Sequence, residues 1–101
     1  MVSLFALYRK PENAETFLDH YRTIHAPLAL RLPGLCSLEW GMASGLPGGD
    51  AAADWFLVAE MRFESSQAAM EALKSPEGRA AAADIRTFAE DLLTMRMVEW
   101  Q

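Results

Sequence analysis

A histidine followed two residues later by a proline, inside a long amphipathic segment, constrains this chain more than any other feature. Between residues 14 and 32, large apolar side chains recur at spacings of three and four, the pattern of a helix with one buried face. These side chains are Phe17, Tyr21, Ile24, Leu28 and Leu32. Pro27 has no N–H, and its ring clashes with the carbonyl four residues earlier, that of Thr23. We therefore predict a helix over residues 14–32 that bends or ends near His25.

The remaining segments alternate between strand and helix patterns. Asn13 is a good N-cap for the first helix, and Ser75 followed by Pro76 marks the start of a later one. The pattern predicts strands over residues 2–9, 35–42, 55–63 and 91–100, and helices over residues 14–32, 65–73 and 75–90. This order is β-α-β-β-α-β with a split second helix. It predicts an α+β, ferredoxin-like fold: a four-stranded antiparallel sheet with the helices on one face.

Composition narrows the possible classes of protein. The 101 residues fit a single domain, 1–101. The net charge of −5 and the scattered nine basic residues argue against nucleic acid as a partner. The longest run of large apolar residues, 55–59, is too short to cross a membrane, and no secretory signal is apparent at the N-terminus. We expect a cytoplasmic protein with no intramolecular disulfide, since Cys36 is the one cysteine.

Two predicted strands are apolar on both faces. In the first strand Phe5 and Leu7 oppose an apolar set that starts at Val2, and in the third Phe56 and Val58 do the same. Helices can cover only one face of the sheet. An uncovered apolar face on a small protein indicates a surface for association. We therefore expect part of the core to be shared between two subunits.

Two groups of residues resemble the EthD family, which belongs to the dimeric α+β barrel proteins. The first is Tyr8-Arg-Lys-Pro11 followed by the segment from Phe17 through Tyr21-Arg22 and His25-Ala26-Pro27-Leu28 to Leu32-Pro-Gly-Leu35. The second comprises Phe63, Ser66, Ser75-Pro-Glu-Gly78, Asp84 and Phe88. The resemblance covers nearly the whole chain, and the first group is the more specific.

The resemblance implies a homodimer whose two sheets pack face to face, with a pocket in each subunit between sheet and helices. Related architectures include muconolactone isomerases, aromatic polyketide cyclases and small cofactor-free monooxygenases. We therefore expect a small enzyme without cofactor or metal, of the isomerase, cyclase or lyase type, acting on a small apolar or aromatic carbonyl compound. The alternatives are a dimer that binds a hydrophobic ligand without catalysis and a cofactor-free monooxygenase. A shared architecture does not select among these chemistries.

His25 is the first candidate for catalysis, because histidine exchanges protons near neutral pH. Tyr21, one helical turn earlier, is a candidate to orient a substrate carbonyl or His25 itself. Asp84 lies in the middle of an alanine-rich helix and would need a partner if buried, for which His25 and Arg22 are the candidates. Structural alternatives stand beside each role: His25 capping a bent helix, Tyr21 as core, and Asp84 on a solvated face.

Other candidates concern the pocket and its surroundings. Tyr8, Trp40 and Phe88 are candidates to line it and contact the substrate, although each also suits a plain core. His20 precedes His25 by five residues, which separates the two by about 140° around an α-helix and predicts a surface position for His20. Cys36 suits a small buried residue on a strand. The glycine-rich segment 43–54 is expected to be a flexible hairpin connection without phosphate-binding features.

Overall fold

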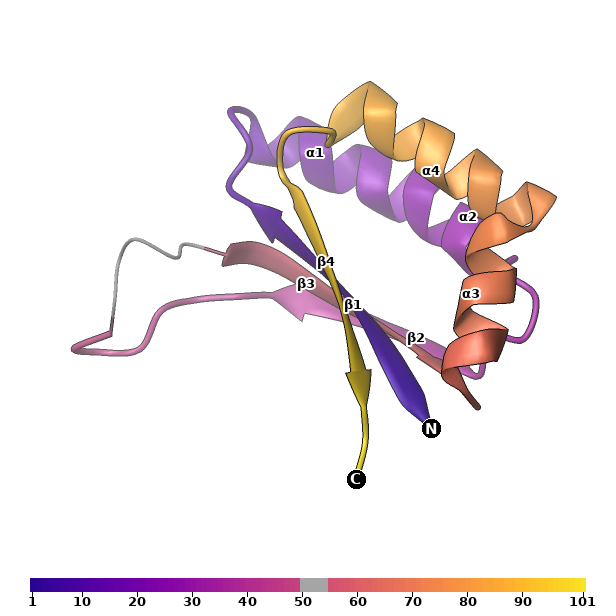
Figure 1. Ribbon diagram of the computed structural model, residues 1–101. Coiled ribbons are helices and arrows are strands. Elements are labelled where there is room, and N and C mark those ends of the chain that lie inside the picture. Colours follow the sequence, from indigo (N-terminus) through magenta and orange to yellow (C-terminus); the bar gives the residue numbers. More distant parts are fainter. Residues whose placement is uncertain (50–54) are drawn as a thin grey trace.

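The sheet has the predicted antiparallel, four-stranded form. The computed structural model describes residues 1–49 and 55–101. The strands run in the order β2-β3-β1-β4, so the first strand of the chain lies between the third and the fourth (Figure 1). They are β1 (Val2–Arg9), β2 (Ser37–Met42), β3 (Trp55–Phe63) and β4 (Leu93–Glu99). This arrangement confirms the ferredoxin-like α+β fold.

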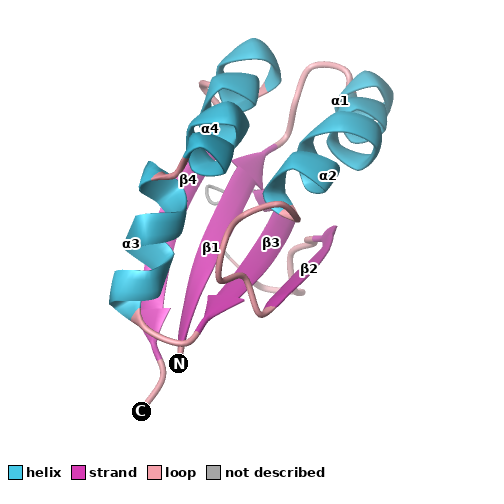
Figure 2. Ribbon diagram, turned by 90° about the vertical axis from the view of Figure 1, so that its right-hand side faces the viewer, coloured by secondary structure: helices cyan, strands magenta, loops and turns pink. Residues whose placement is uncertain are grey.

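All helices lie on one face of the sheet (Figure 2). The first helical segment is continuous but changes its hydrogen-bonding pattern twice, from α to π and back to α. Its parts are α1 (Ala14–His20), the π turn η1 (Tyr21–His25) and α2 (Ala26–Ala29). The second helical region comprises α3 (Ser66–Lys74) and α4 (Pro76–Phe88). In the described part of the chain, no helix is long and apolar enough to cross a membrane.

Side-chain caps fix the starts of the helices as the sequence predicts. The Asn13 side chain accepts a hydrogen bond from the Thr16 N–H at 3.0 Å, which starts α1. The Ser75 hydroxyl oxygen accepts from the Gly78 N–H at 3.0 Å, with Pro76 in the first turn of α4. A Cβ on Gly78 would lie 2.3 Å from the Ala72 carbonyl oxygen, so only glycine fits this junction between α3 and α4.

The core forms where the helices cover the sheet. Successive residues of a strand face opposite sides, and the helix-facing set of β1 is fully buried; it is Val2, Leu4, Ala6 and Tyr8. Phe17 and Tyr21 pack onto this set from the first helix, with their rings 5.5 and 5.7 Å from that of Tyr8. This face supplies the apolar surroundings of the site described below.

The other face of the sheet carries no helix, although it holds several apolar side chains. Phe5 and Leu7 lie there, paired in register with Glu60 and Val58 of β3. Near them, the buried Ser3 hydroxyl donates to a Glu60 carboxylate oxygen at 2.6 Å and accepts from the indole N–H of Trp100 at 2.8 Å. Trp100 is itself 49% exposed, so this apolar face reaches the surface of the protein.

Several predicted boundaries were wrong. The regular helix ends at Ala29 and not at Leu32, and β2 begins at Ser37 rather than at residue 35. Cys36 therefore precedes the strand and is exposed, contrary to the buried position expected for it. β4 is shorter than predicted by two residues at its start and one at its end. Residues 50–54 of the expected hairpin connection lie outside the described residues.

Candidate functional site

The π turn changes which side chains the first helix buries. A π-helix closes its hydrogen bonds over five residues where an α-helix uses four, and here the Ala26 N–H donates to the Tyr21 carbonyl. The buried face consequently moves forward by one residue. Ile24, predicted to be buried, is 46% exposed, while His25 is only 6% exposed. Likewise Ala29 is buried where the periodicity favoured Leu28, which is only partly covered.

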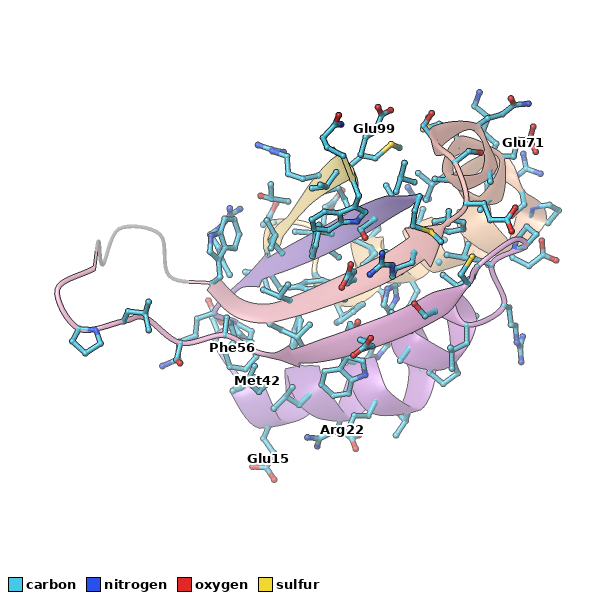
Figure 3. All side chains as sticks on the ribbon, turned by 90° about the horizontal axis from the view of Figure 1, so that it is seen from below. Glu15, Arg22, Met42, Phe56, Glu71 and Glu99 are labelled. Carbon is cyan, nitrogen blue, oxygen red and sulfur yellow. The ribbon has the colours of Figure 1, made fainter. Side chains whose placement is uncertain are left out.

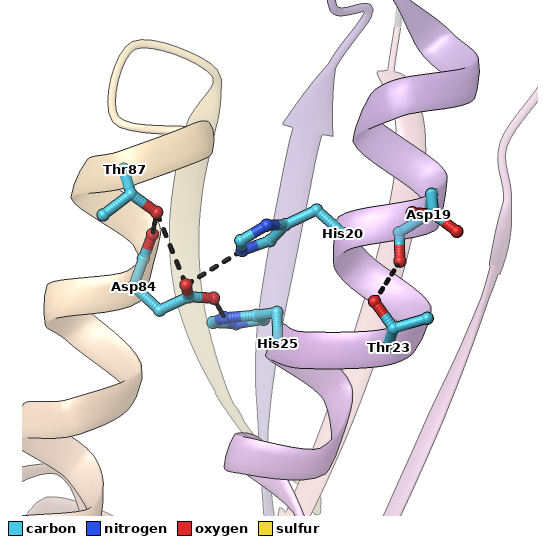
Figure 4. A network of polar contacts seen from close by, with 6 residues as sticks. All are labelled: Asp19, His20, Thr23, His25, Asp84 and Thr87. Atoms are coloured by element: carbon cyan, nitrogen blue, oxygen red, sulfur yellow. Dashed lines mark hydrogen bonds and ion pairs between the residues drawn. The ribbon is translucent and has the colours of Figure 1, made fainter.

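The same turn corrects the predicted position of His20. In an α-helix His20 and His25 would lie on different faces, but the additional residue in the π turn brings them onto one. Both side chains reach Asp84 on the neighbouring helix α4 (Figure 4). His20 is half-buried rather than a free surface residue, and its ring lies against Phe88 with 4.3 Å between ring centres.

Asp84 bridges the two imidazoles. One carboxylate oxygen, Oδ2, lies 2.9 Å from His25 Nδ1, and the other, Oδ1, lies 2.9 Å from His20 Nε2 (Figure 4). The Thr87 hydroxyl donates to the Asp84 backbone carbonyl at 2.6 Å. Arg22, the other partner considered for Asp84, instead lies over the Trp40 ring at 5.7 Å, beside strand β2 (Figure 3). The structure thus pairs Asp84 with His25 and adds His20.

Burial decides the charge of His25. Its removal from water lowers its pKa below the ordinary value of 6.5, more than the hydrogen bond to Asp84 raises it, and the nearby His20 lowers it further. The imidazole is therefore neutral at pH 7. An ionised carboxylate only accepts hydrogen bonds, so His25 Nδ1 must carry the hydrogen that Asp84 receives. Nε2 of His25 is then the unprotonated nitrogen, the form a general base requires.

A cavity of about 600 Å³ adjoins His25. This volume is within the range of small-molecule binding sites. It lies between the sheet and helices α3 and α4, and its lining is mostly aliphatic. Representative lining residues are Leu4, Ala6, Met61, Leu73, Ile85 and Met97. His25 and Tyr8 contribute polar groups to this mostly apolar wall, and Arg86 and Arg96 contribute charged ones.

Two tyrosines stand beside the histidine. Burial, with smaller contributions from Tyr21 and Asp84, raises the pKa of Tyr8 far above its ordinary value, and burial raises that of Tyr21 to about 12. Both hydroxyls therefore keep their protons through the physiological range and can donate hydrogen bonds. Tyr8 lines the cavity. Tyr21 is not among the lining residues and lies against His25, with 5.5 Å between ring centres.

The remaining candidates form the wall behind these groups. Trp40 packs edge-on against Tyr21 at 4.9 Å, and Phe88 lies 5.3 Å from His25. Neither is among the residues that line the cavity. The catalytic and substrate-binding roles of the six candidate residues stay predictions.

His20 was missed as a member of the cluster, because its alignment depends on the π turn. Pro27 signalled an irregularity there but not its type.

Within residues 1–49 and 55–101, no group of three or more histidine, cysteine and acidic side chains could hold a metal ion. The His20–Asp84–His25 cluster has only two imidazoles, and both are directed at the same carboxylate (Figure 4). Its arrangement is that of a hydrogen-bonded network, in which the carboxylate fixes the orientation of both rings.

The fold and this cavity define a class of small α+β proteins with a ferredoxin-like sheet. Residues 9–91 match the model of the EthD domain, and the chain belongs to the EthD family. It is 34% identical over 95 residues to an uncharacterised 11.0 kDa protein of Rhodococcus erythropolis from the thcB–thcC intergenic region, covering 94% of this chain and 90% of that protein. A crystal structure of an EthD family protein from Bacillus halodurans superposes with a TM-score of 0.91 at 35% identity, covering 100% and 99% of the two chains.

More distant structures share the fold alone. A dimeric ferredoxin-like protein of unknown function from Thermobifida fusca has a TM-score of 0.72 at 19% identity, covering 98% of this chain and 90% of its own. A hydroxynitrile lyase from Passiflora edulis has 0.73 at 18%, covering 99% and 94%. A cofactor-independent oxygenase from Streptomyces nogalater has 0.68 at 16%, covering 99% and 92%. The fold therefore occurs in small enzymes of different chemistry.

Proposed function

We propose that the chain is a cofactor-independent enzyme of the isomerase, cyclase or lyase type that acts on a small apolar or aromatic carbonyl compound. The observation that carries this proposal is the position of His25. Its imidazole lines an apolar cavity of about 600 Å³ while its Nδ1 is held 2.9 Å from the Asp84 carboxylate. A neutral base fixed in this way at an apolar wall suits the removal of a weakly acidic proton from carbon.

In the proposed reaction, His25 Nε2 takes a proton from the carbon next to the substrate carbonyl. The electron pair of that C–H bond forms the double bond of an enolate, and the negative charge moves to the carbonyl oxygen. His25 becomes an imidazolium, which Asp84 stabilises through the Nδ1 hydrogen bond. Nε2 then returns the proton to a different carbon, which completes an isomerisation. In a ring closure, the enolate carbon instead forms a bond to a second carbonyl carbon of the same molecule, whose C=O π electrons move to its oxygen, and Nε2 gives the proton to that alkoxide.

The tyrosines and aromatic rings support this step. Tyr8 lines the cavity with a hydroxyl that stays protonated, so it would donate a hydrogen bond to the developing enolate oxygen. Tyr21 would act as a positioning residue, since its ring packs against that of His25. Phe88 would exclude water from the ring of His25, and Trp40 would hold Tyr21 in place.

Proton exchange at carbon tests the proposal without knowledge of the natural substrate. A panel of small aromatic ketones and lactones, for example 2-indanone, is incubated in D₂O, and loss of the α-proton signal is followed by NMR. We expect the protein to accelerate exchange of at least one compound, and His25→Gln to reduce the acceleration by about 10²- to 10⁴-fold. The matched control is Arg79→Gln, an exposed residue of α4 outside the cavity lining.

Thermal unfolding separates catalysis from structure in the same variants. We expect His25→Gln to melt within a few degrees of the unaltered protein, because the glutamine amide can still donate to Asp84. A large fall in melting temperature with exchange retained would assign His25 a structural role. Absence of accelerated exchange across the panel would contradict the proposed chemistry.

The second candidate is a module that binds a hydrophobic ligand without changing it, and the mainly aliphatic lining of the cavity favours it. Native mass spectrometry against a metabolite library distinguishes the two, since a ligand recovered intact after incubation indicates binding alone. Oxygen uptake with candidate quinols tests the third possibility, a cofactor-free monooxygenase, since a neighbour in fold is described as a cofactor-independent oxygenase.

We also propose a homodimer formed through the sheet face that carries no helix. Phe5, Leu7 and Val58 are only partly covered on this face, and the Thermobifida fusca neighbour is described as dimeric. Light scattering coupled to size-exclusion chromatography should give twice the monomer mass for the unaltered protein. Leu7→Glu should reduce the measured mass to that of one monomer. Leu30→Glu, at a position 61% exposed beyond α2, is the control and should remain dimeric.

A further inference from the structure

Asp84 serves two histidines that differ in their access to water. Its two carboxylate oxygens each lie 2.9 Å from one imidazole nitrogen, Nδ1 of His25 and Nε2 of His20 (Figure 4). The His20 side chain is 29% exposed, whereas that of His25 is 8% exposed. The two rings are therefore unequal as acceptors of a first proton, and they share one carboxylate as the counter-charge.

One carboxylate cannot stabilise two imidazolium ions equally well. When both rings are neutral, each donates one N–H to Asp84 and keeps one free nitrogen. A proton on either ring forms an ion pair with the carboxylate, and a second proton must then enter beside a like charge. Such sites titrate as a coupled pair, and their protons are taken up in two separate steps.

We infer that His20 is a positioning residue that accepts the first proton of the pair and so keeps His25 in its unprotonated, basic form. The inference deepens the proposed function and rests on it for its catalytic meaning. Water can solvate a charge on the half-exposed His20, while a charge on the buried His25 loses that solvation. With His20 charged, the Asp84 carboxylate is already paired, and His25 loses part of the attraction that would make it accept a proton.

The other groups packed around the two imidazoles do not compete with them for this proton. Tyr8 from β1 and Tyr21 from η1 hold their protons until alkaline pH. Arg86 from α4 and Arg96 from β4 line the same cavity as His25, and a guanidinium group does not lose its proton in a protein. Phe88 contacts both imidazole rings from α4 without a charge. Thr87 lies 3.4 Å from Asp84 Oδ1 and is likewise uncharged.

The chain contains only two histidines, so NMR can follow both directly. Long-range ¹H–¹⁵N spectra of the imidazole rings report the protonation and tautomer of each ring as the pH is lowered from 8 to 5. Two variants separate the roles of His20. His20→Gln keeps a hydrogen-bond donor for Asp84 without a titrating group, and His20→Phe removes both. Arg79→Gln, on an exposed part of α4, is the control.

We expect His20 to take up its proton before His25 in the unaltered protein. In His20→Gln the titration midpoint of His25 should rise by about one pH unit, because the competing charge is gone. In His20→Phe it should also rise, and His25 should exchange between tautomers because Asp84 is less well held. Where exchange at carbon is measurable, the acid limb of its pH profile should shift upward in both variants.

A merely structural His20 would give another result. The midpoint of His25 would then be the same in the unaltered protein and in His20→Gln, and only the stability would differ in His20→Phe. That result, or protonation of His25 before His20, would overturn the inference. The NMR titration needs no substrate, so it stands or falls independently of the carbonyl-exchange test. Coupling without accelerated exchange would leave His20 as a partner of His25 and would reject the proposed enzyme alone.

Discussion

The two halves of the first helix bury their side chains by different rules. In α1, the apolar periodicity holds: Phe17 is 4% exposed, and Asn13 caps the first turn. Tyr21, the first residue of η1, is still buried as the periodicity predicts, but after it the pattern fails, because Ile24 is 46% exposed while His25 is 6% exposed. A large apolar side chain faces water there and an ionisable ring does not. In the first half, hydrophobicity decides which side chains face the core. In the second half, the backbone turns His25 toward Asp84 instead. Such a local departure from the hydrophobic pattern is expected at a functional site.

The largest effect expected from this comparison is on stability. Phe17→Ala should lower the free energy of unfolding by about 3–5 kcal/mol, because it removes a fully buried ring. Ile24→Ala, on the same helix and in the same predicted apolar stripe, should change it by only about 0.5 kcal/mol or less. Urea denaturation of both variants measures the difference. Similar losses in the two variants would mean that the π turn does not expose Ile24 in solution.

Alkaline titration should show how tightly the start of the second half is enclosed. The folded protein holds the pKa of Tyr21 at about 12 and that of Tyr8 higher still, above the ordinary value of 10.0. As the pH rises, the unfolded chain therefore loses its phenolic protons at a lower pH than the folded protein does. The contribution of the two tyrosines to the free energy of unfolding is fully present below about pH 10 and declines above it. These are the two tyrosines of the chain.

Absorbance of tyrosinate at 295 nm and far-ultraviolet circular dichroism follow this change together. We expect ionisation to coincide with unfolding, whereas the same chain in guanidinium should ionise around pH 10. Ionisation of either tyrosine near pH 10 in the folded protein would contradict their burial beside His25.

Acid should affect the second half through His25. Because folding lowers the pKa of His25 below 6.5, the unfolded chain binds this proton more readily than the folded one. The contribution of His25 to the free energy of unfolding should therefore be fully present above pH 6.5. It should be lost as the pH falls through the lowered pKa. Urea midpoints between pH 7.5 and 5.5 measure this slope. His25→Gln should flatten it, and an equal slope in that variant would assign the effect to other groups.

A smaller loss of stability than that of Phe17→Ala is expected at the cap of the first half. Asn13→Ala should lower the free energy of unfolding by about 1 kcal/mol, since the Thr16 N–H loses its acceptor. Asn13→Ser, which keeps an acceptor, should recover most of that loss. Thermal denaturation of the two variants measures the difference. Equal losses would show that the helix start depends on packing rather than on the side-chain hydrogen bond.

Local signals made most of the fold predictable. The alternation in residues 2–9 and 55–63 gave both central strands with their observed bounds, and the caps at Asn13 and Ser75 gave two helix starts. Errors arose where tertiary packing decides an ending, as at Ala29 and Ser37. The alternation of apolar side chains predicts that a strand is present, but it does not predict the residue at which pairing with the neighbouring strand begins.

The site was less predictable because it depends on one residue of helical phase. His25, Tyr21 and Asp84 were recognisable as candidates, and Pro27 indicated an irregular helix near them. An α-helical wheel nevertheless separated His20 from His25 and turned Ile24 inward. The π turn reverses both assignments, and nothing in the spacing of residues 14–32 distinguishes a π turn from a bend. Contacts across two helices, such as those of Asp84, follow only from the folded structure.

The tautomer of His25 at pH 7.5 tests the central claim most directly. Long-range ¹H–¹⁵N NMR of the unaltered protein should show His25 neutral, with its hydrogen on Nδ1 and Nε2 unprotonated. A hydrogen on Nε2, or an imidazole that titrates at 6.5 or above as in a solvated peptide, would contradict a buried base held by Asp84.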